Sequence, residues 1–173
     1  MQKYTRQAKV TDLPQILAIL RDARAQLKET GSSQWQGTYP AKDDIVSDIK
    51  AQNGYVFING RVIAGYAAVI VGDDPTHQII DGRWQNDVDP YATLHRVCFS
   101  STYQGQGLAK QFMACILSLQ YANGIRNFRI DTSKFNQLVQ HIAKQTGFSY
   151  RGVIKVTGDQ ENPRRRAYEL NLE

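Results

Sequence analysis

The stretch that decides the fold is Thr93–Lys110, TLHRVCFSSTYQGQGLAK. Residues 93–99 are apolar and β-branched enough to predict a strand inside a sheet. Gly105 and Gly107 predict a tight loop after that strand. Apolar residues then recur at helical spacing from Gly107 onward, which predicts a helix that stops at Asn123-Gly124.

The start of this predicted helix lacks the residues that usually begin a helix. Ser, Thr, Asp or Asn normally caps the first free amides, and acidic residues normally follow. Here the sequence is Gln104-Gly105-Gln106-Gly107, and the first turn contains Lys110 and no acid. Free amides, glycines that let a ligand approach the backbone, and a cation together indicate an external anion, most simply a phosphate or pyrophosphate.

Two other phosphate-binding patterns match this stretch less well. The P-loop needs four residues between its glycines and then Lys and Ser or Thr, which is absent. The dinucleotide pattern needs a third glycine where this chain has Lys110, although Asp131 could serve as its acid about 20 residues on. A nucleotide-binding α/β protein therefore stays open as an alternative.

Gln104-x-x-Gly107-x-Ala109 resembles the Q/R-x-x-G-x-G/A motif of the GNAT superfamily of N-acetyltransferases. In that family the loop and helix start bind the pyrophosphate of acetyl-coenzyme A. The strand before the loop, here ending in 97–99, pairs with the pantetheine arm. The resemblance covers residues 93–148 well and implies a mostly antiparallel sheet that splays beside its central strand and leaves a cleft.

The resemblance and the loop chemistry together give a set of expected cofactor-binding residues. Its members lie on the predicted strand, the glycine loop and the next helix start: Val97, Cys98, Phe99, Gln104, Gly105, Gln106, Gly107, Leu108, Ala109, Lys110 and Asn136. Asn136 occupies the position of a family asparagine that touches the cofactor, and it also suits the N-cap of a helix.

The order of elements predicts one α+β (mixed α/β) domain over residues 1–173, with a sheet flanked by about four helices. Expected strands are 3–10, 55–58, 62–71, 93–99, 127–132, 148–156 and 166–172, with a short extra strand near 78–80; expected helices follow Thr11, Pro40, Gly107 and Asn136. An exposed last strand could pair across a homodimer.

Composition favours an ordinary globular protein, with 42% hydrophobic and 21% charged residues. No run approaches the roughly 18 apolar residues of a membrane span, and the N-terminus lacks the apolar core of a signal peptide. We therefore expect a cytoplasmic protein without a membrane partner. Cys98 and Cys115 have no metal-ligand spacing and are expected to be buried thiols.

The net charge is +5, but the basic residues are scattered apart from Arg164–Arg166. No nucleic-acid motif accompanies that run. A basic nucleic-acid-binding domain is therefore an alternative with little support, and salt-dependent binding to a duplex would be its test.

Acetylation of an amine by a thioester requires a group that takes a proton from the amine. His95, on the central strand just before the splayed section, is the candidate base, since imidazole titrates near neutral pH. Alternation places Thr93 and His95 on one face of the strand and Arg96 on the other, unless a β-bulge interrupts the strand. His77 and His141 are expected at the surface.

One position departs from the family pattern. Many GNAT enzymes carry a tyrosine, the acid toward the thiolate, four residues before the Gly-Phe pair, and this chain has Ala143 there. Another group or water could supply the proton, with Tyr103, Tyr121, Tyr150 and Tyr168 as candidates. Otherwise the chain would be a non-catalytic acyl-coenzyme A-binding or sensing module.

The acceptor site is expected in the variable loops. Trp35 and Tyr39 lie between the first two helices, and Trp84 and Tyr91 lie in or beside the long connection after residue 71. Aromatic loop residues often line small-molecule sites. The resemblance thus implies a metal-free N-acetyltransferase, in which a small-molecule or peptide amine attacks acetyl-coenzyme A directly.

Overall fold

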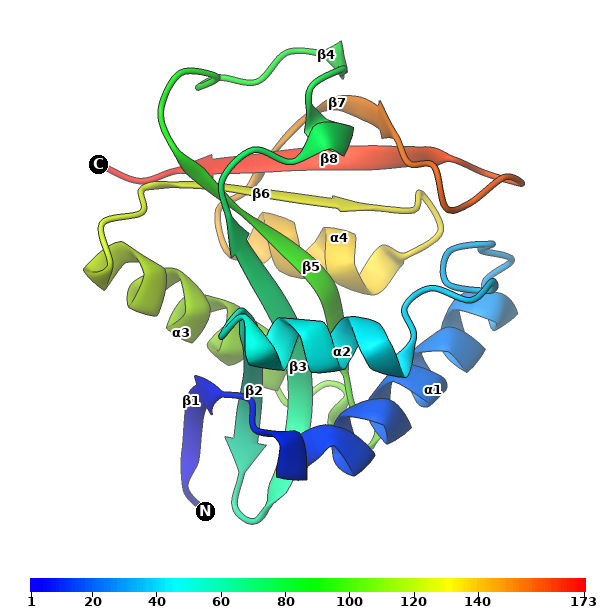
Figure 1. Cartoon of the computed structure of the whole chain (residues 1–173), viewed down its shortest axis with the longest axis vertical. Helices are drawn as coiled ribbons and strands as arrows, with labels where there is room; N and C mark the ends of the chain where they lie inside the picture. The colour runs from blue at the N-terminus through cyan, green and yellow to red at the C-terminus, as the bar shows by residue number, and fades with distance from the viewer.

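The computed structural model describes residues 1–173 and contains one eight-stranded sheet with helices on both faces (Figure 1). The strands are β1 Lys3–Gln7, β2 Gly54–Asn59, β3 Val62–Val71, β4 Asp81–Gly82, β5 Tyr91–Phe99, β6 Asn127–Thr132, β7 Ser149–Lys155 and β8 Arg164–Asn171. The α-helices are α1 Leu13–Glu29, α2 Lys42–Lys50, α3 Leu108–Ala122 and α4 Gln137–Gln145.

The strand order is β1-β2-β3-β5-β6-β8-β7-β4, and only β5 and β6 are parallel neighbours. These two strands pair from Tyr91 and Asn127 as far as Leu94 and Ile130, and then they separate. Beyond that point β5 pairs only with β3, while β6 continues along β8. The expected mostly antiparallel sheet, splayed beside its central strand, is confirmed.

The two faces of the sheet carry separate apolar cores because successive strand residues point to opposite sides. Phe57 of β2 packs in the larger core with Phe112 of α3 and Ile142 of α4. Its neighbour Val56 packs in the second core with Ile16 of α1 and Ile45 of α2. Helices α3 and α4 therefore cover one face of the sheet, and α1 and α2 cover the other. The splay between β5 and β6 lies between these two pairs of helices.

Three details differ from or extend the sequence-based expectations. The short extra strand forms at Asp81–Gly82 rather than at 78–80. The last strand, β8, is not exposed: it lies between β6 and β7, and both of its edges are paired. The prediction that the last strand pairs across a dimer is therefore wrong.

None of the helices combines the length and apolarity needed to cross a bilayer.

Candidate active site

The splay between β5 and β6 opens into two adjoining cavities. The larger has a volume of about 630 Å³ and lies among the ends of β5 and β6, the α1–α2 loop and the β7–β8 loop. The smaller, of about 120 Å³, follows the end of β5 toward the start of α4. Four residues line both: Trp35, Val97, Asn136 and Val139. A ligand in the smaller cavity would therefore meet a ligand in the larger one.

The loop before α3 presents a set of free backbone amides. The N–H groups of Gly105, Gly107, Leu108, Ala109 and Lys110 donate no hydrogen bond within the chain, and no side chain caps the helix. Gly105 and Gly107 have φ of 75° and 70°, and a Cβ at either would enter open space. Unpaired amides beside open space fit the pyrophosphate of coenzyme A.

The edge of β5 beyond Leu94 has no strand neighbour on the β6 side, so its backbone groups there are available to a pantetheine arm. Val97, Cys98 and Phe99 line the smaller cavity. The Phe99 ring packs edge-on against Phe112, with centroids 6.0 Å apart. Burial raises the pKa of Cys98 to about 12, so this thiol is unsuited to act as a nucleophile.

Asn136 caps α4, because its Oδ1 accepts the Val139 N–H at 3.3 Å. It also lies where the two cavities meet. The prediction that Asn136 is a helix N-cap is therefore confirmed for its side-chain carbonyl oxygen. Its role toward the cofactor stays a prediction.

His95 and Asp74 form an ion-pair-type contact in the larger cavity. The His95 Nε2 atom lies 2.9 Å from Asp74 Oδ2, and both residues line the cavity. His95 is partly exposed, with 23% of its side-chain surface accessible. Since Nε2 faces the carboxylate, Nδ1 is the nitrogen left to take a proton.

The long connection between β3 and β5 holds Asp74 in place. Its Oδ1 accepts from Thr76 twice, from Oγ1 at 2.6 Å and from the backbone N–H at 2.9 Å. Its own N–H donates to the hydroxyl of Tyr91 at 2.8 Å. Burial opposes ionisation of Asp74, but the hydrogen bonds from His95 and Thr76 outweigh it and hold its pKa well below the usual range. The carboxylate is therefore ionised at neutral pH.

A β-bulge places His95 and Arg96 on the same cavity. Ala68 pairs with His95 and Tyr66 with Cys98, so two β5 residues oppose one β3 residue, and Arg96 adopts φ of 55°. Both His95 and Arg96 line the larger cavity. The opposite placement that alternation predicts does not occur, because this strand contains the bulge that was the exception to that prediction.

The Arg96 guanidinium is held by a buried polar network. Its Nε donates to Asp48 Oδ2 at 2.7 Å, and a terminal nitrogen donates to the hydroxyl of Tyr39 at 2.6 Å. The Tyr66 hydroxyl donates to the same Asp48 oxygen at 2.6 Å. Burial lowers the pKa of Arg96 and the bond to Asp48 raises it, with a net rise. This network fixes the bulge against α2 and keeps Arg96 charged.

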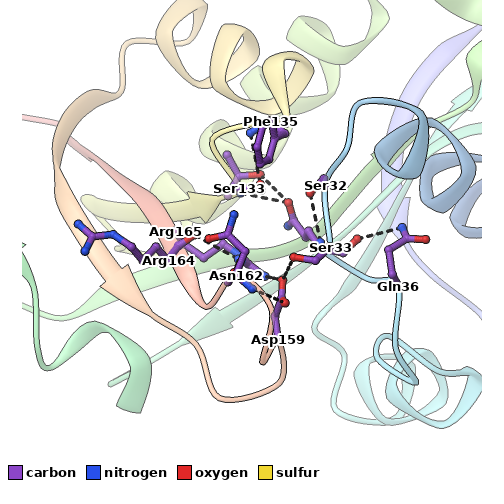
Figure 2. Close-up of polar contacts among 11 residues, drawn as sticks. Ser32, Ser33, Gln36, Ser133, Phe135, Asp159, Asn162, Arg164 and Arg165 are labelled. Atoms are coloured by element: carbon purple, nitrogen blue, oxygen red, sulfur yellow. Dashed lines mark hydrogen bonds and ion pairs between the residues drawn. The ribbon is translucent and has the colours of Figure 1, made fainter.

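The loops over the larger cavity are joined to each other. Figure 2 shows Ser33, from the α1–α2 loop, and Asp159, from the β7–β8 loop, pointing toward one another. The Ser33 Oγ donates to Asp159 Oδ2 at 2.8 Å, and Arg165 donates to the same oxygen at 2.8 Å. Burial opposes ionisation of Asp159, but the Asn162 amide and Arg165 lower its pKa overall.

The predicted aromatic acceptor wall is found only in part. Trp35 and Tyr39 line the larger cavity, but Trp84 and Tyr91 lie outside both cavities. Trp84 is a core side chain whose Nε1 donates to the His77 carbonyl at 3.0 Å. Tyr91 supports Asp74 instead. Both rings pack against the Arg129 guanidinium, whose carbon lies 4.0 Å from the centroid of a Trp84 ring and 3.8 Å from the centroid of the Tyr91 ring.

His77 is buried, contrary to the expectation, and its Nε2 lies 3.0 Å from Asp131 Oδ2. His141 is exposed as expected. Asp74, Asp131 and Gln34 all line the larger cavity and were not identified as acceptor-site residues from the sequence. No local signal marks them, since each acquires its place from contacts distant in sequence.

None of the four tyrosines proposed to replace the one missing at Ala143 reaches the cavities, and Ala143 itself is buried in α4. Tyr103, Tyr121, Tyr150 and Tyr168 line neither cavity. The Tyr168 hydroxyl donates to Gln140, and the Tyr121 hydroxyl donates to the Glu173 carbonyl. Tyr39 is the one tyrosine in the wall of the larger cavity.

The sequence and the fold of this chain resemble those of known acetyltransferases. The sequence model of the acetyltransferase (GNAT) family matches residues 19–148. A GNAT-family acetyltransferase from Streptococcus agalactiae 2603 superposes with a TM-score of 0.90 at 33% identity, over 99% of this chain and 96% of that one. A search of curated proteins found no match.

Two more distant structures share the fold. A GNAT-family acetyltransferase from Listeria monocytogenes 4b F2365 has a TM-score of 0.72 and 21% identity, over 98% of this chain and 95% of that one. The ribosomal-protein-S18-alanine N-acetyltransferase from Escherichia coli has a TM-score of 0.68 and 15% identity, over 99% and 95%. From the family match and the 33% identical structure, it follows that this chain belongs to the GNAT family of acetyltransferases.

Proposed function

We propose that the chain is an N-acetyltransferase that transfers the acetyl group of acetyl-coenzyme A to a primary amine by direct attack. The observation that carries the proposal is the His95–Asp74 contact of 2.9 Å in the larger cavity. That cavity adjoins the smaller one beside the unpaired edge of β5. A basic nitrogen is therefore available where an acceptor would meet the thioester.

The chain's own residues would hold acetyl-coenzyme A, which supplies the acetyl thioester. The free amides of the loop before α3 would bind the pyrophosphate. The backbone of Val97 and Phe99 would bind the pantetheine arm. Asn136, at the junction of the cavities, would contact the cofactor there.

The amine must lose a proton to become a product amide. In the proposed reaction His95 takes that proton, directly or through a water molecule, at Nδ1. The ionised Asp74 holds the ring through Nε2 and stabilises the imidazolium that forms. No covalent enzyme intermediate is needed, and Cys98 is unsuited to form one.

The first experiment measures cofactor binding and turnover separately. Thermal unfolding with acetyl-coenzyme A, coenzyme A, NAD and ATP identifies the ligand. At about 100 times the dissociation constant the stabilisation is about 2.7 kcal/mol, which raises Tm by roughly 5–10 °C. We expect this rise with the two coenzyme A ligands only. A rise with NAD or ATP alone would favour the nucleotide-binding alternative.

Turnover is then followed as thiol release with a panel of primary amines. His95→Ala should lower kcat by about 10²–10⁴-fold without weakening acetyl-coenzyme A binding. Binding without thiol release from any amine would instead favour an acyl-coenzyme A-binding module, the alternative that Ala143 suggests.

A further inference from the structure

The acceptor cavity is lined by a side-chain amide donor that has no hydrogen-bond partner within the chain. We propose that Gln34 is a specificity-determining residue whose Nε2 donates a hydrogen bond to a neutral oxygen of the acceptor, an amide carbonyl or a hydroxyl close to the reacting amine. This inference rests on the proposed acetyltransferase function and names the class of acceptor for the same cavity.

The orientation of the Gln34 side chain is fixed by its partners. Only 7% of Gln34 is exposed. Its Oε1 accepts the Ser133 backbone N–H at 3.1 Å and the Thr132 hydroxyl at 3.3 Å. A backbone N–H can only donate, so the atom facing it is the oxygen and the NH₂ group points elsewhere.

The Nε2 atom of Gln34 makes no hydrogen bond within the chain, and Gln34 lines the larger cavity. The Nε2 atom is not among the fully buried polar atoms, so it is open to a ligand in the cavity. A ligand oxygen in the cavity supplies the missing acceptor. An amine that carries no oxygen would leave this donor unpaired, which is the basis for discrimination.

The loop that carries Gln34 is held in place before any ligand binds. The Gln34 N–H donates to Ser32 Oγ at 3.2 Å, and the Gln34 carbonyl accepts from Gln36 at 3.2 Å. The residue before Gln34, Ser33, donates a hydrogen bond to Asp159, as Figure 2 shows. A donor fixed in this way costs little entropy on binding.

The charges in the same cavity decide which kind of oxygen fits. Asp74 and Asp131 present carboxylates there, and each has only a histidine as its charge partner. The two arginines of the wall, Arg96 and Arg165, are already paired with Asp48 and Asp159. The cavity therefore favours an ammonium group and disfavours a carboxylate, so an amino amide or amino alcohol fits better than a free amino acid.

The test compares two amines of similar shape, alaninamide and 3-methylbutan-2-amine, which has carbon in place of the amide group. Steady-state thiol release gives kcat/KM for each amine at one pH. In Gln34→Glu the oxygens still accept from Ser133 and Thr132, but the donor is lost. We expect the preference for alaninamide over the hydrocarbon amine to fall about tenfold relative to the unmodified protein.

Two further variants keep the result interpretable. Gln160→Glu adds the same charge to the cavity wall without touching Gln34, and it should leave the preference unchanged. Gln34→Met removes the donor without adding charge, and it should lower the preference as Gln34→Glu does. A fall confined to the two Gln34 variants supports the proposal. An unchanged preference in them, or an equal fall in Gln160→Glu, overturns it.

Failure of the proposed function gives a different result. If no amine of the panel, these two included, releases thiol, the acetyltransferase proposal fails, and calorimetry on the coenzyme A-saturated protein then tests Gln34 by itself. Alaninamide binding that weakens about tenfold in Gln34→Met supports the recognition role. Binding that does not change, or no binding to the unmodified protein, overturns it.

Discussion

The His95 ring and the Asp74 carboxylate come from different elements, and the structure brings them together by anchoring the connection before β5. Asp74 receives hydrogen bonds from Thr76 and donates its own N–H to Tyr91, the first residue of β5. Its position therefore depends on the strand that also carries His95. In this arrangement Asp74 is a positioning residue for the base.

Replacement of Asp74 tests this positioning role. Asp74→Ala should lower kcat by about 10–100-fold, less than His95→Ala, because the base remains but its ring is no longer held. Acetyl-coenzyme A binding, measured by calorimetry, should not change. Thr76→Ala removes one support of the carboxylate and should show a smaller loss. A kcat equal to that of the unmodified protein in Asp74→Ala would contradict the role.

Asp48 holds the bulge in β5 against α2 through its contact with Arg96. It accepts from Arg96 and Tyr66, and 5% of its side chain is exposed. Asp48→Ala leaves a buried guanidinium without its partner and should destabilise the protein by about 3–5 kcal/mol in denaturant unfolding. Asp22→Ala is the control, since its contact with Arg21 is exposed and 3.9 Å long. It should change stability by less than about 0.5 kcal/mol.

At the scale of elements, the glycine loop and α3 form a unit whose sequence and structure agree. The helix begins at Leu108 after Gly107, which has left-handed backbone geometry and no side chain to cap the first turn. The loop keeps this geometry because glycine has no Cβ. The amides that a side-chain cap would otherwise satisfy remain available to a ligand.

Gly107→Ala should separate folding from cofactor binding. The left-handed backbone costs a residue with a Cβ about 1–2 kcal/mol, and the Cβ would meet no protein atom. We expect a folded protein whose acetyl-coenzyme A binding is at least about tenfold weaker by calorimetry. Gly31→Ala, with φ of 78° and equally open space, is the matched control. It should lose similar stability and bind the cofactor normally.

At the scale of the whole molecule, three carboxylates that accept hydrogen bonds from basic side chains make the stability of the protein depend on pH. The carboxylates of Asp12, Asp74 and Asp159 contact the side chains of Arg6, His95 and Arg165, respectively. The pKa of each of these three carboxyl groups is lowered in the folded protein: for Asp12 first by Arg6, and for Asp74 and Asp159 by hydrogen bonds that outweigh burial. Their contribution to folding is therefore present above the unfolded pKa of about 3.9.

Acidification should remove that contribution. As the pH falls through 3.9 toward the lowered folded pKa values, the unfolded chain binds protons that the folded chain does not, so the free energy of unfolding decreases. We expect Tm to be nearly constant from pH 7 to about 5 and to fall steeply below about 4. In Asp159→Asn the decrease between pH 5 and 3 should be smaller. A Tm that rises on acidification would contradict the assignment.

Much of this molecule could be predicted from local sequence patterns. The spacing of apolar side chains two to four positions apart predicts the strand–loop–helix at residues 93–122. Local patterns also predict the helix stop at Asn123-Gly124 and the strand at Val62–Val71. The family motif lies in the same local stretch, and the fold and family that it implied are confirmed. These features depend on backbone conformation and on amphipathic spacing, which neighbouring residues largely determine.

Only the tertiary structure decided the acceptor side. The bulge at Arg96 depends on an ion pair to Asp48 in another element, and the burial of His77 depends on Asp131 and on the folding of the long connection. Gln34 is oriented by groups at the end of β6. Each of these positions depends on contacts between residues far apart in the chain, which periodicity and spacing in a single sequence do not encode.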